Sequence, residues 1–529
     1  MPIRMTEDDP QGNKRRRGAS RPSSNQGPMR GRGGGNLGGG LGNIVGALLP
    51  MLLKKPKLLI ILVVAAVVLY FLFGKSCSSP VSQEGGISNF FRGGELNKEV
   101  YEETEIYEPL ADNVRNPLPE RVSLEKYIPR RLNQGRQGSC VAWASAYAAR
   151  TILEAQRTGK NPNSVRFSPS FMYNQISLDH SSCQGSYIKL AMDNMMNIGA
   201  VPFDDFKYDE TSCNRDPGGQ LKAKAQAYKI KGFQRLTAEG QSRMTEMLSI
   251  KQNLAKGSPV IIGMMVGGSF MQNMMGKEAW IPTRSDYTKS QFGGHAMCII
   301  GYDDYKMDGE GAFQIMNSWG EDWGKKGIFW IRYSDFKEFN VESYGLYPMG
   351  NADQKEQSVF KGDFGLELNE GKKTIALQKV GDIYFESVGK LKKGDRFKVE
   401  LTNNVECYTY IFGEEKDGTS YVLFPYTAKH SPYCGITGTR LFPRDTSMEP
   451  DGIGTKDKIA VLITKKPIDY NAMTKKINAA QGANYETKVK NAFGGMLSGN
   501  VQFSGVNTIA FSTSSSSSDA VAFVIGINK

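Results

Sequence analysis

The sequence predicts an α+β domain followed by an all-β, sandwich-like domain, both preceded by one transmembrane helix. Three observations lead to this fold class: helical periodicity early in the globular part, apolar strands later in it, and short alternating segments towards the end. The chain has 529 residues, of which 40% are hydrophobic and 23% are charged, so most of it is able to bury a core. These values exclude a wholly disordered chain.

Residues 1–57 carry an excess of positive charge. They contain eleven basic and three acidic residues, whereas the whole chain has a net charge of +12. The segment has no aromatic residue and no periodic pattern, which a folded nucleic-acid-binding surface is expected to show. We therefore expect a disordered basic and glycine-rich tail in the cytoplasm, and no nucleic acid among the partners.

Residues 58–74 form an uncharged apolar run, LLIILVVAAVVLYFLFG, followed directly by Lys75. Such a run is near the lower limit for a helix that crosses a hydrocarbon core of about 30 Å. The basic residues before it orient the amino terminus to the cytoplasm and export everything after Lys75. A cleaved signal peptide is the alternative, but its charged region would be unusually long and FGKSCSS lacks a small-x-small cleavage site. The sequence therefore predicts a signal anchor and a single-pass protein of the cell membrane.

Residues 75–117 are rich in Ser, Gly, Glu, Asn and Pro, so we expect a linker there. From residue 118 the pattern becomes globular, and residues 118–349 are expected to form the α+β domain. Its expected helices are 141–156, 170–178 and 188–199, with 223–228 leading into mixed structure. Its expected strands are 259–266, 295–302, 312–317 and 327–333.

Residues 350–529 change to short alternating segments separated by Gly, Asn and Asp turns. The expected strands are 397–401, 408–412, 421–424, 458–463 and 521–527. Strands of this length and spacing are typical of an antiparallel β-sandwich or half-barrel.

The chain has only three histidines, so a reaction that needs a base near neutral pH has few candidates. Cys140 opens the Ala-rich helix, where unpaired backbone N–H groups and the helix dipole favour a thiolate. His295 begins an apolar strand directly after two glycines. Asn317 ends another strand in the stretch N-S-W-G, where its amide is able to fix one histidine nitrogen and Trp319 to shield that contact. Taken singly, each residue could also be structural.

In this order, the three segments resemble the active-site motifs of papain-like (C1) cysteine peptidases. The resemblance implies that Cys140 is the nucleophile and His295 the base. It assigns the orienting role to Asn317 and the oxyanion hole to Gln134, six residues before the nucleophile. It also implies a two-lobed domain with a helical lobe and a β-barrel-like lobe. His295 and Asn317 follow Cys140 by 155 and 177 residues, so modest insertions are implied.

The segment C-Q-G-S-Y that starts at residue 183 is similar to the family's C-N-G-G segment, which lines the substrate cleft. The substrate-binding residues implied by the resemblance are Gly185, Ser186, Gly294 and Trp319, with Gly263 as a further candidate.

Gln137 stands where secreted family members have a cysteine, so the family's usual disulfide is broken. On the exported side Cys183 and Cys213 could pair with each other, as could Cys407 and Cys434. The sequence has no paired C-x-x-C, no H-E-x-x-H and no calcium loop, so no metal and no cofactor are expected.

The sequence therefore predicts a membrane-anchored cysteine endopeptidase of a bacterial envelope that acts on proteins or peptides. Residues 391–469 resemble an uncharacterised bacterial β-domain attached to envelope peptidases, which implies either an envelope partner or a stabilising appendage. No long helical inhibitory pro-region is visible before residue 118, so control by that route is not expected. Two alternatives stay open: a Cys-dependent amidase or ligase on envelope substrates, and a non-catalytic peptide-binding scaffold.

Overall fold

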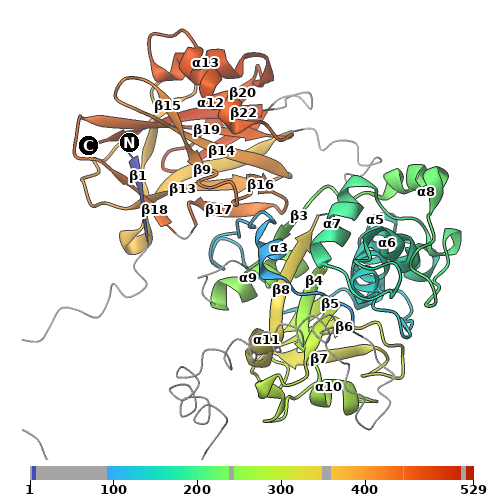
Figure 1. Ribbon diagram of the computed structural model, residues 1–529. Helices are drawn as coiled ribbons and strands as arrows, with labels where there is room; N and C mark the ends of the chain where they lie inside the picture. The colour runs from blue at the N-terminus through green and yellow to red at the C-terminus, as the bar shows by residue number, and fades with distance from the viewer. Residues whose placement is uncertain (1–2, 8–91, 238–242, 348–358, 445, 514–519) are drawn as a thin grey trace, which may run out of the picture. The chain divides into compact units, whose positions relative to one another are not determined.

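The computed structural model of the protein describes residues 3–7, 92–237, 243–347, 359–444, 446–513 and 520–529 (Figure 1). The predicted membrane segment, residues 58–74, lies outside this part, as do most of the predicted tail and the first part of the predicted linker. Of the helices in the described part, none combines the length and the apolar composition that a membrane crossing requires.

The sheet of the α+β domain is antiparallel and has the order β3-β8-β4-β5-β6-β7, with β2 paired to β5. The predicted strands are confirmed to within two residues. The bounds are β2 Arg121–Ser123, β3 Phe233–Arg235, β4 Val260–Val266, β5 Gly293–Asp303, β6 Ala312–Met316, β7 Ile328–Arg332 and β8 Asn340–Leu346. In β5 the residues from His295 to Tyr302 are all buried, because this central strand is covered on both faces.

The predicted helix at 141–156 is confirmed as one continuous element. It consists of α4 (Cys140–Ala142), the π-helical η2 (Trp143–Arg150) and α5 (Thr151–Thr158), and it ends at Gly159, whose φ of 65° is the left-handed value favoured at helix ends. The other predicted helices appear as α6 (Pro169–Ile176) and α7 (Ile188–Asn197). The predicted segment 223–228 covers the end of one helix, α8, and the whole of the next, η5, whose bounds follow. The remaining helices of this region are α3 Lys98–Glu102, η1 Glu125–Tyr127, η3 Pro162–Ser164, η4 Phe203–Asp205, α8 Gly218–Ala225, η5 Gln226–Tyr228, α9 Arg243–Ala255, α10 Gly268–Gln272, η6 Asp286–Thr288 and α11 Tyr333–Phe339.

The C-terminal domain consists of two sheets packed face to face, as predicted for a sandwich. One has the order β1-β18-β13-β9-β21-β20, with β10 on β9 and β17 on β13; the other has the order β11-β12-β22-β19-β14-β15, with β16 on β14. Phe364 of the first sheet stacks on Phe523 of the second, and both belong to one apolar core. The bounds are β1 Ile3–Glu7, β9 Lys361–Leu368, η7 Glu370–Lys372, β10 Lys373–Ile375, β11 Leu377–Lys379, β12 Tyr384–Ser387, β13 Phe397–Asn403, β14 Cys407–Glu414, β15 Ser420–Phe424, β16 Tyr433–Cys434, β17 Gly438–Phe442, β18 Thr446–Pro450, β19 Lys456–Thr464, β20 Val501–Ser504, β21 Ile509–Thr513 and β22 Ala520–Asn528.

Two helices, α12 (Tyr470–Ala479) and α13 (Tyr485–Phe493), add a layer that the sequence did not predict (Figure 1). They cover the outer face of the second sheet. Alternate residues of β19 therefore face different cores: Ile459 and Val461 face the sandwich, whereas Ala460 and Leu462 face the helices. Burial on both faces explains why β19 is apolar throughout its middle.

The amino-terminal segments also differ from the expectation of a disordered tail and a simple linker. Residues 3–7 form strand β1, which pairs antiparallel with β18 and buries Ile3. In the predicted linker, the Ile106 amide donates to the Lys429 carbonyl at 2.7 Å, and the Ala111 amide donates to the Thr439 carbonyl at 2.8 Å. These pairings join residues more than 300 positions apart, so no local pattern could signal them.

The cysteines follow the expectation in one case of two. Cys183 and Cys213 form the expected disulfide. Cys407 and Cys434 lie directly opposite each other on β14 and β16, but both are free thiols, so the second expected pair is not formed. The two thiols are hydrogen-bonded to each other, and the Cys434 sulfur also contacts the Thr409 hydroxyl at 3.5 Å.

Candidate active site

Cys140, the first residue of the central helix, is fully buried. Its sulfur accepts a hydrogen bond from the Ala296 backbone N–H at 3.3 Å, so the nucleophile candidate lies against the strand that carries His295. Burial raises the pKa of the Cys140 thiol to about 12, although neighbouring backbone N–H groups, including that of Ala296, act in the opposite direction. The helix start alone predicts a lowered pKa, and burial outweighs it in this arrangement.

His295 and Asn317 meet because β5 and β6 are antiparallel neighbours, which brings the start of one strand beside the end of the other. The His295 Nε2 and the Asn317 Oδ1 are 2.8 Å apart. The Trp319 ring stacks on the imidazole with centroids 4.4 Å apart, so an indole shields this contact as the sequence predicts. Asn317 therefore fixes one ring nitrogen and leaves the other for a different partner.

The other ring nitrogen, His295 Nδ1, is buried and has no hydrogen-bond partner among the described residues. Burial lowers the pKa of the imidazole to about 4, against the Asn317 hydrogen bond, which raises it. At neutral pH the closed site therefore holds a neutral thiol and a neutral imidazole. A Cys140 thiolate beside a protonated His295 therefore requires access of water to the site.

Gln134 ties the loop before Cys140 to the loop after β6. Its Nε2 donates to the Gln137 carbonyl at 2.9 Å, and its Oε1 accepts from the Ser318 hydroxyl at 2.6 Å. Its backbone N–H also donates to the Ser318 carbonyl at 2.8 Å. The three sequence segments that carry the predicted site residues thus converge on one place in the fold.

The predicted substrate-binding residues surround this centre. Gly294 directly precedes His295 on β5, and Trp319 lies against the histidine ring. The Gly185–Ser186 loop is joined to the loop before Cys140 by a hydrogen bond from the Gly138 amide to the Cys183 carbonyl at 3.1 Å. Gly263 faces the same region from β4, which pairs with β5.

Two features of the site were not found by sequence reasoning. One is the segment from Arg92 to Leu96, which lies against Gly138, His295 and Gly263. The other is Glu342 of β8, which lies opposite Gly263 in the strand pairing and is buried. In the sequence, the first feature is marked only by the adjacent residues Gly93 and Gly94, and the second only by Glu342 as the one acidic residue of its strand. Neither pattern is specific for an active site.

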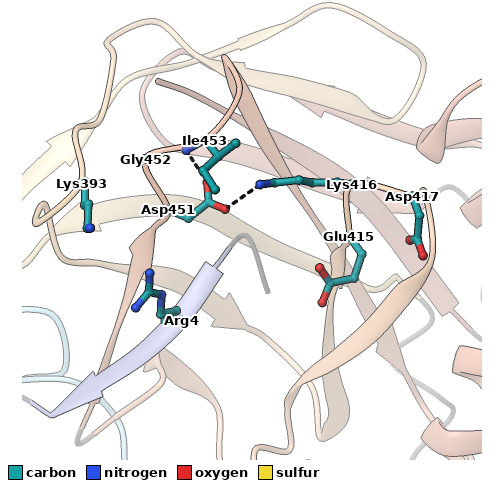
Figure 2. A pocket seen from close by; sticks show the side chains of 8 residues that line it. All are labelled: Arg4, Lys393, Glu415, Lys416, Asp417, Asp451, Gly452 and Ile453. Atoms are coloured by element: carbon teal, nitrogen blue, oxygen red, sulfur yellow. Dashed lines mark hydrogen bonds and ion pairs between the residues drawn. The ribbon is translucent and has the colours of Figure 1, made fainter.

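An open hollow lies on the C-terminal domain. It has a volume of about 870 Å³, is wide open to solvent, and is lined by charged side chains (Figure 2). Asp451 in this hollow pairs with Lys416 at 3.6 Å and with Lys529 at 2.6 Å. The lining contains neither a thiol nor an imidazole, so it does not offer the chemistry of the Cys140 site. The lining residues are Arg4, Lys393, Glu415, Lys416, Asp417, Asp451, Gly452 and Ile453.

Comparison with known proteins assigns the two domains separately. Residues 118–349 match the family model described as papain family cysteine protease, and residues 390–467 match a domain of unknown function, DUF4384. An uncharacterized peptidase C1-like protein of Acanthamoeba polyphaga mimivirus is 27% identical over 218 residues, which are 40% of this chain and 67% of that protein. Cathepsin K of Mus musculus is 24% identical over 234 residues, which are 44% of this chain and 65% of that protein.

The chain thus spans about two thirds of the length of these two relatives. Among solved structures, xylellain, a cysteine protease from Xylella fastidiosa, is 24% identical with a TM-score of 0.41, covering 51% of this chain and 100% of that one. Residues 118–349 form a hydrolytic cysteine peptidase domain of the papain (C1) family.

Proposed function

We propose that the protein is a membrane-anchored cysteine endopeptidase that hydrolyses peptide bonds through Cys140, His295 and Asn317, with Gln134 in the oxyanion hole. The observation that carries this proposal is the 2.8 Å contact between His295 and Asn317, with the Cys140 sulfur 3.3 Å from the amide of the residue after the histidine. A nucleophile, a base and a group that orients the base are the parts that acyl transfer needs.

In the proposed reaction, the Cys140 thiol gives its proton to His295 Nδ1, the ring nitrogen that has no other partner among the described residues. The sulfur attacks the carbonyl carbon of the scissile bond. The oxyanion accepts hydrogen bonds from the Gln134 side-chain amide and from the Cys140 backbone N–H. The imidazolium then protonates the leaving amine, and water hydrolyses the thioester to regenerate the thiol.

For the location, we infer a single-pass anchor at residues 58–74, with the amino terminus in the cytoplasm and the peptidase on the periplasmic or extracytoplasmic side of a bacterial envelope. The apolar run and the basic residues before it support this topology. The Cys183–Cys213 disulfide also supports it, because disulfides persist in oxidising compartments and are rare in the cytosol.

The test is hydrolysis of a fluorogenic peptide by the full chain. We expect Cys140→Ala to abolish turnover, whereas Cys298→Ala, which changes another fully buried free thiol on the neighbouring strand, leaves it intact. Equal turnover by wild type and Cys140→Ala would remove the proposed nucleophile. If the full chain released fragments from isolated peptidoglycan but did not cleave peptides, the same chemistry would belong to an amidase.

A further inference from the structure

Strand β1, which consists of residues 3–7, occupies the outer edge of β18 in the C-terminal domain (Figure 1). β18 pairs with β13 on its other side, so without β1 it would be an edge strand with unpaired backbone groups. The pairing of β1 with β18 is antiparallel, with Ile3 opposite Pro450 and Glu7 opposite Thr446. A row of unpaired N–H and C=O groups along a strand is a site at which a further strand binds.

The edge of β18 includes an apolar site for one side chain of the added strand. Ile3 is only 1% exposed and belongs to the apolar core of the sandwich, as does Met448 of β18. Met5 is partly buried and packs against the same core, whereas Arg4 is exposed. Because side chains alternate along a strand, an apolar residue is accommodated at every second position.

A hydroxyl of the second sheet holds the backbone at the Ile3 position. Tyr421 of β15 accepts a hydrogen bond from the Ile3 amide at 3.2 Å and donates one to the Ile3 carbonyl at 3.3 Å. Pro450, which lies opposite Ile3, has no N–H group, so β18 cannot supply a donor there. Pro450 and the Tyr421 hydroxyl together fix which residue of an added strand enters the apolar site.

Arg4 shows which charge the next position accepts. It lies opposite Glu449 in the strand pairing and lines the same open hollow as Asp451 (Figure 2). The other charged groups of the lining are three carboxylates and two ammonium groups, from Glu415, Asp417 and Asp451 and from Lys393 and Lys416. Together with Glu449 they surround this position with an excess of negative charge, which favours a basic side chain.

The proposed membrane anchor separates β1 from this edge. β1 precedes residues 58–74 and β18 follows them, and a single membrane crossing places the two strands on opposite sides. In the anchored protein, residues 3–7 of the same chain or of a second copy therefore cannot pair with β18. The edge is then available to a segment of another protein on the extracytoplasmic side.

We propose that the edge of β18, together with Tyr421 and the apolar site for Ile3, is a strand-acceptor site that binds an extended segment of an envelope protein. The segment carries an apolar, a basic and an apolar residue in succession, as Ile3, Arg4 and Met5 do, and adds to the sheet as an antiparallel strand. This inference rests on the proposed anchor topology. It gives the C-terminal domain a binding role that does not depend on the chemistry of Cys140.

The test uses bacterial spheroplasts that produce the full chain with Thr446→Cys. The probe, added outside, is a synthetic peptide with the sequence of residues 1–9 and the change Glu7→Cys, which lies opposite position 446 in the pairing. After oxidation with copper phenanthroline, we expect mass spectrometry to find a disulfide between the peptide and position 446. Lys475→Cys, at an exposed position on α12, is the matched control and should give about tenfold less adduct or below.

The sequence of the peptide tests recognition. Ile3→Asp in the peptide places a charge in the apolar site, so the adduct at position 446 should also fall about tenfold or more. Equal adduct formation by the two peptides would overturn the proposal.

A second pair of positions tests the register and does not depend on the fold of the first variant. A peptide with Arg4→Cys should react with the full chain that carries Glu449→Cys, because the two positions lie opposite each other. The peptide with Glu7→Cys should not react with that chain. Adducts that form regardless of the position in the peptide would contradict a defined acceptor site.

The same cells distinguish failure of the acceptor site from failure of the anchor topology. A full chain with both Glu7→Cys and Thr446→Cys should form no disulfide between these two positions. Its formation within one chain would show that residues 3–7 reach their own β18, which contradicts the anchor and removes the basis of the proposal. If neither this disulfide nor a peptide adduct forms at either pair of positions, the acceptor site is overturned and the topology stands.

Discussion

The two domains place their polar groups in opposite ways. The peptidase domain buries a thiol and an imidazole completely, under a short segment of its own chain. The C-terminal domain leaves a hollow of about 870 Å³ open to water and lines it with charges, of which Asp451 is already paired with lysines (Figure 2). The size of a hollow is therefore a poor guide to chemistry in this protein. The residues that line a site and the contacts they make determine which reaction it can support.

The largest expected effect concerns stability alone and lies in the C-terminal domain. Lys529 is buried between Asp451 and Asp457, at 2.6 Å from each carboxylate. Lys529→Met leaves two buried carboxylates without this partner, so we expect a loss of about 3 kcal/mol or more in the free energy of unfolding. Urea denaturation of wild type and variant measures this difference in the free energy of unfolding. Peptide hydrolysis under native conditions should not change, and a parallel loss of activity would show that the two domains are coupled.

A pH-dependent effect of similar size is expected at Glu342. Burial raises the pKa of its carboxyl to about 7, so the folded state binds a proton that the unfolded chain has released. Stability from this group is fully present below the ordinary glutamate pKa and is lost as pH rises through about 7, by roughly 3 kcal/mol in all. The difference in unfolding free energy between wild type and Glu342→Gln should fall across this window. A difference that is constant with pH would contradict the raised pKa.

The next effect concerns mainly activity and lies in the peptidase domain. Gln134→Ala removes the proposed oxyanion donor, so we expect kcat to fall on the order of a hundredfold. It also removes the acceptor of the Ser318 hydroxyl, a bond of 2.6 Å. A thermal unfolding measurement separates the two consequences. We expect the variant to stay folded at the temperature of the assay, so that the fall in kcat does not come from unfolding. An unchanged kcat would exclude Gln134 from the oxyanion hole.

The smallest effect is expected in the open hollow. Lys416→Ala removes a half-exposed cation whose pairing with Asp451 at 3.6 Å is screened by water. We expect the stability to change by less than about 1 kcal/mol and the hydrolysis rate to stay the same. A clear loss of either would show that the hollow contributes more than its contacts indicate.

The sequence predicted those elements of the candidate site that depend on local patterns. Short-range periodicity and motif spacing predict the helix that begins at Cys140, the strand that begins at His295 and the strand that ends at Asn317. The structure confirms these elements, pairs His295 with Asn317 and places the Cys140 sulfur against the backbone of Ala296. Helices α12 and α13 were not predicted, although Asp469 and Asn484 cap them, because they lie among alternating segments that are typical of strands.

The remaining features depend on contacts between distant segments. Residues 92–97 meet Ser186 and Gly294 only in the folded chain, and nothing in their sequence marks them as neighbours of the Cys140 site. The shifted pKa values of Cys140 and His295 have the same origin. Helix position predicts an acidic thiol, but burial under residues from elsewhere in the chain decides the outcome.

In the proposed reaction, Cys140 reacts because His295 takes its proton. The most direct measurement treats the full chain with an epoxysuccinyl peptide and determines by mass spectrometry which cysteine is modified and how fast. We predict a single adduct on Cys140 in wild type, and an adduct that forms far more slowly in His295→Ala, with Cys298, Cys407 and Cys434 unmodified in both. Modification of Cys140 at the same rate in His295→Ala, or modification of another cysteine instead, would contradict the account.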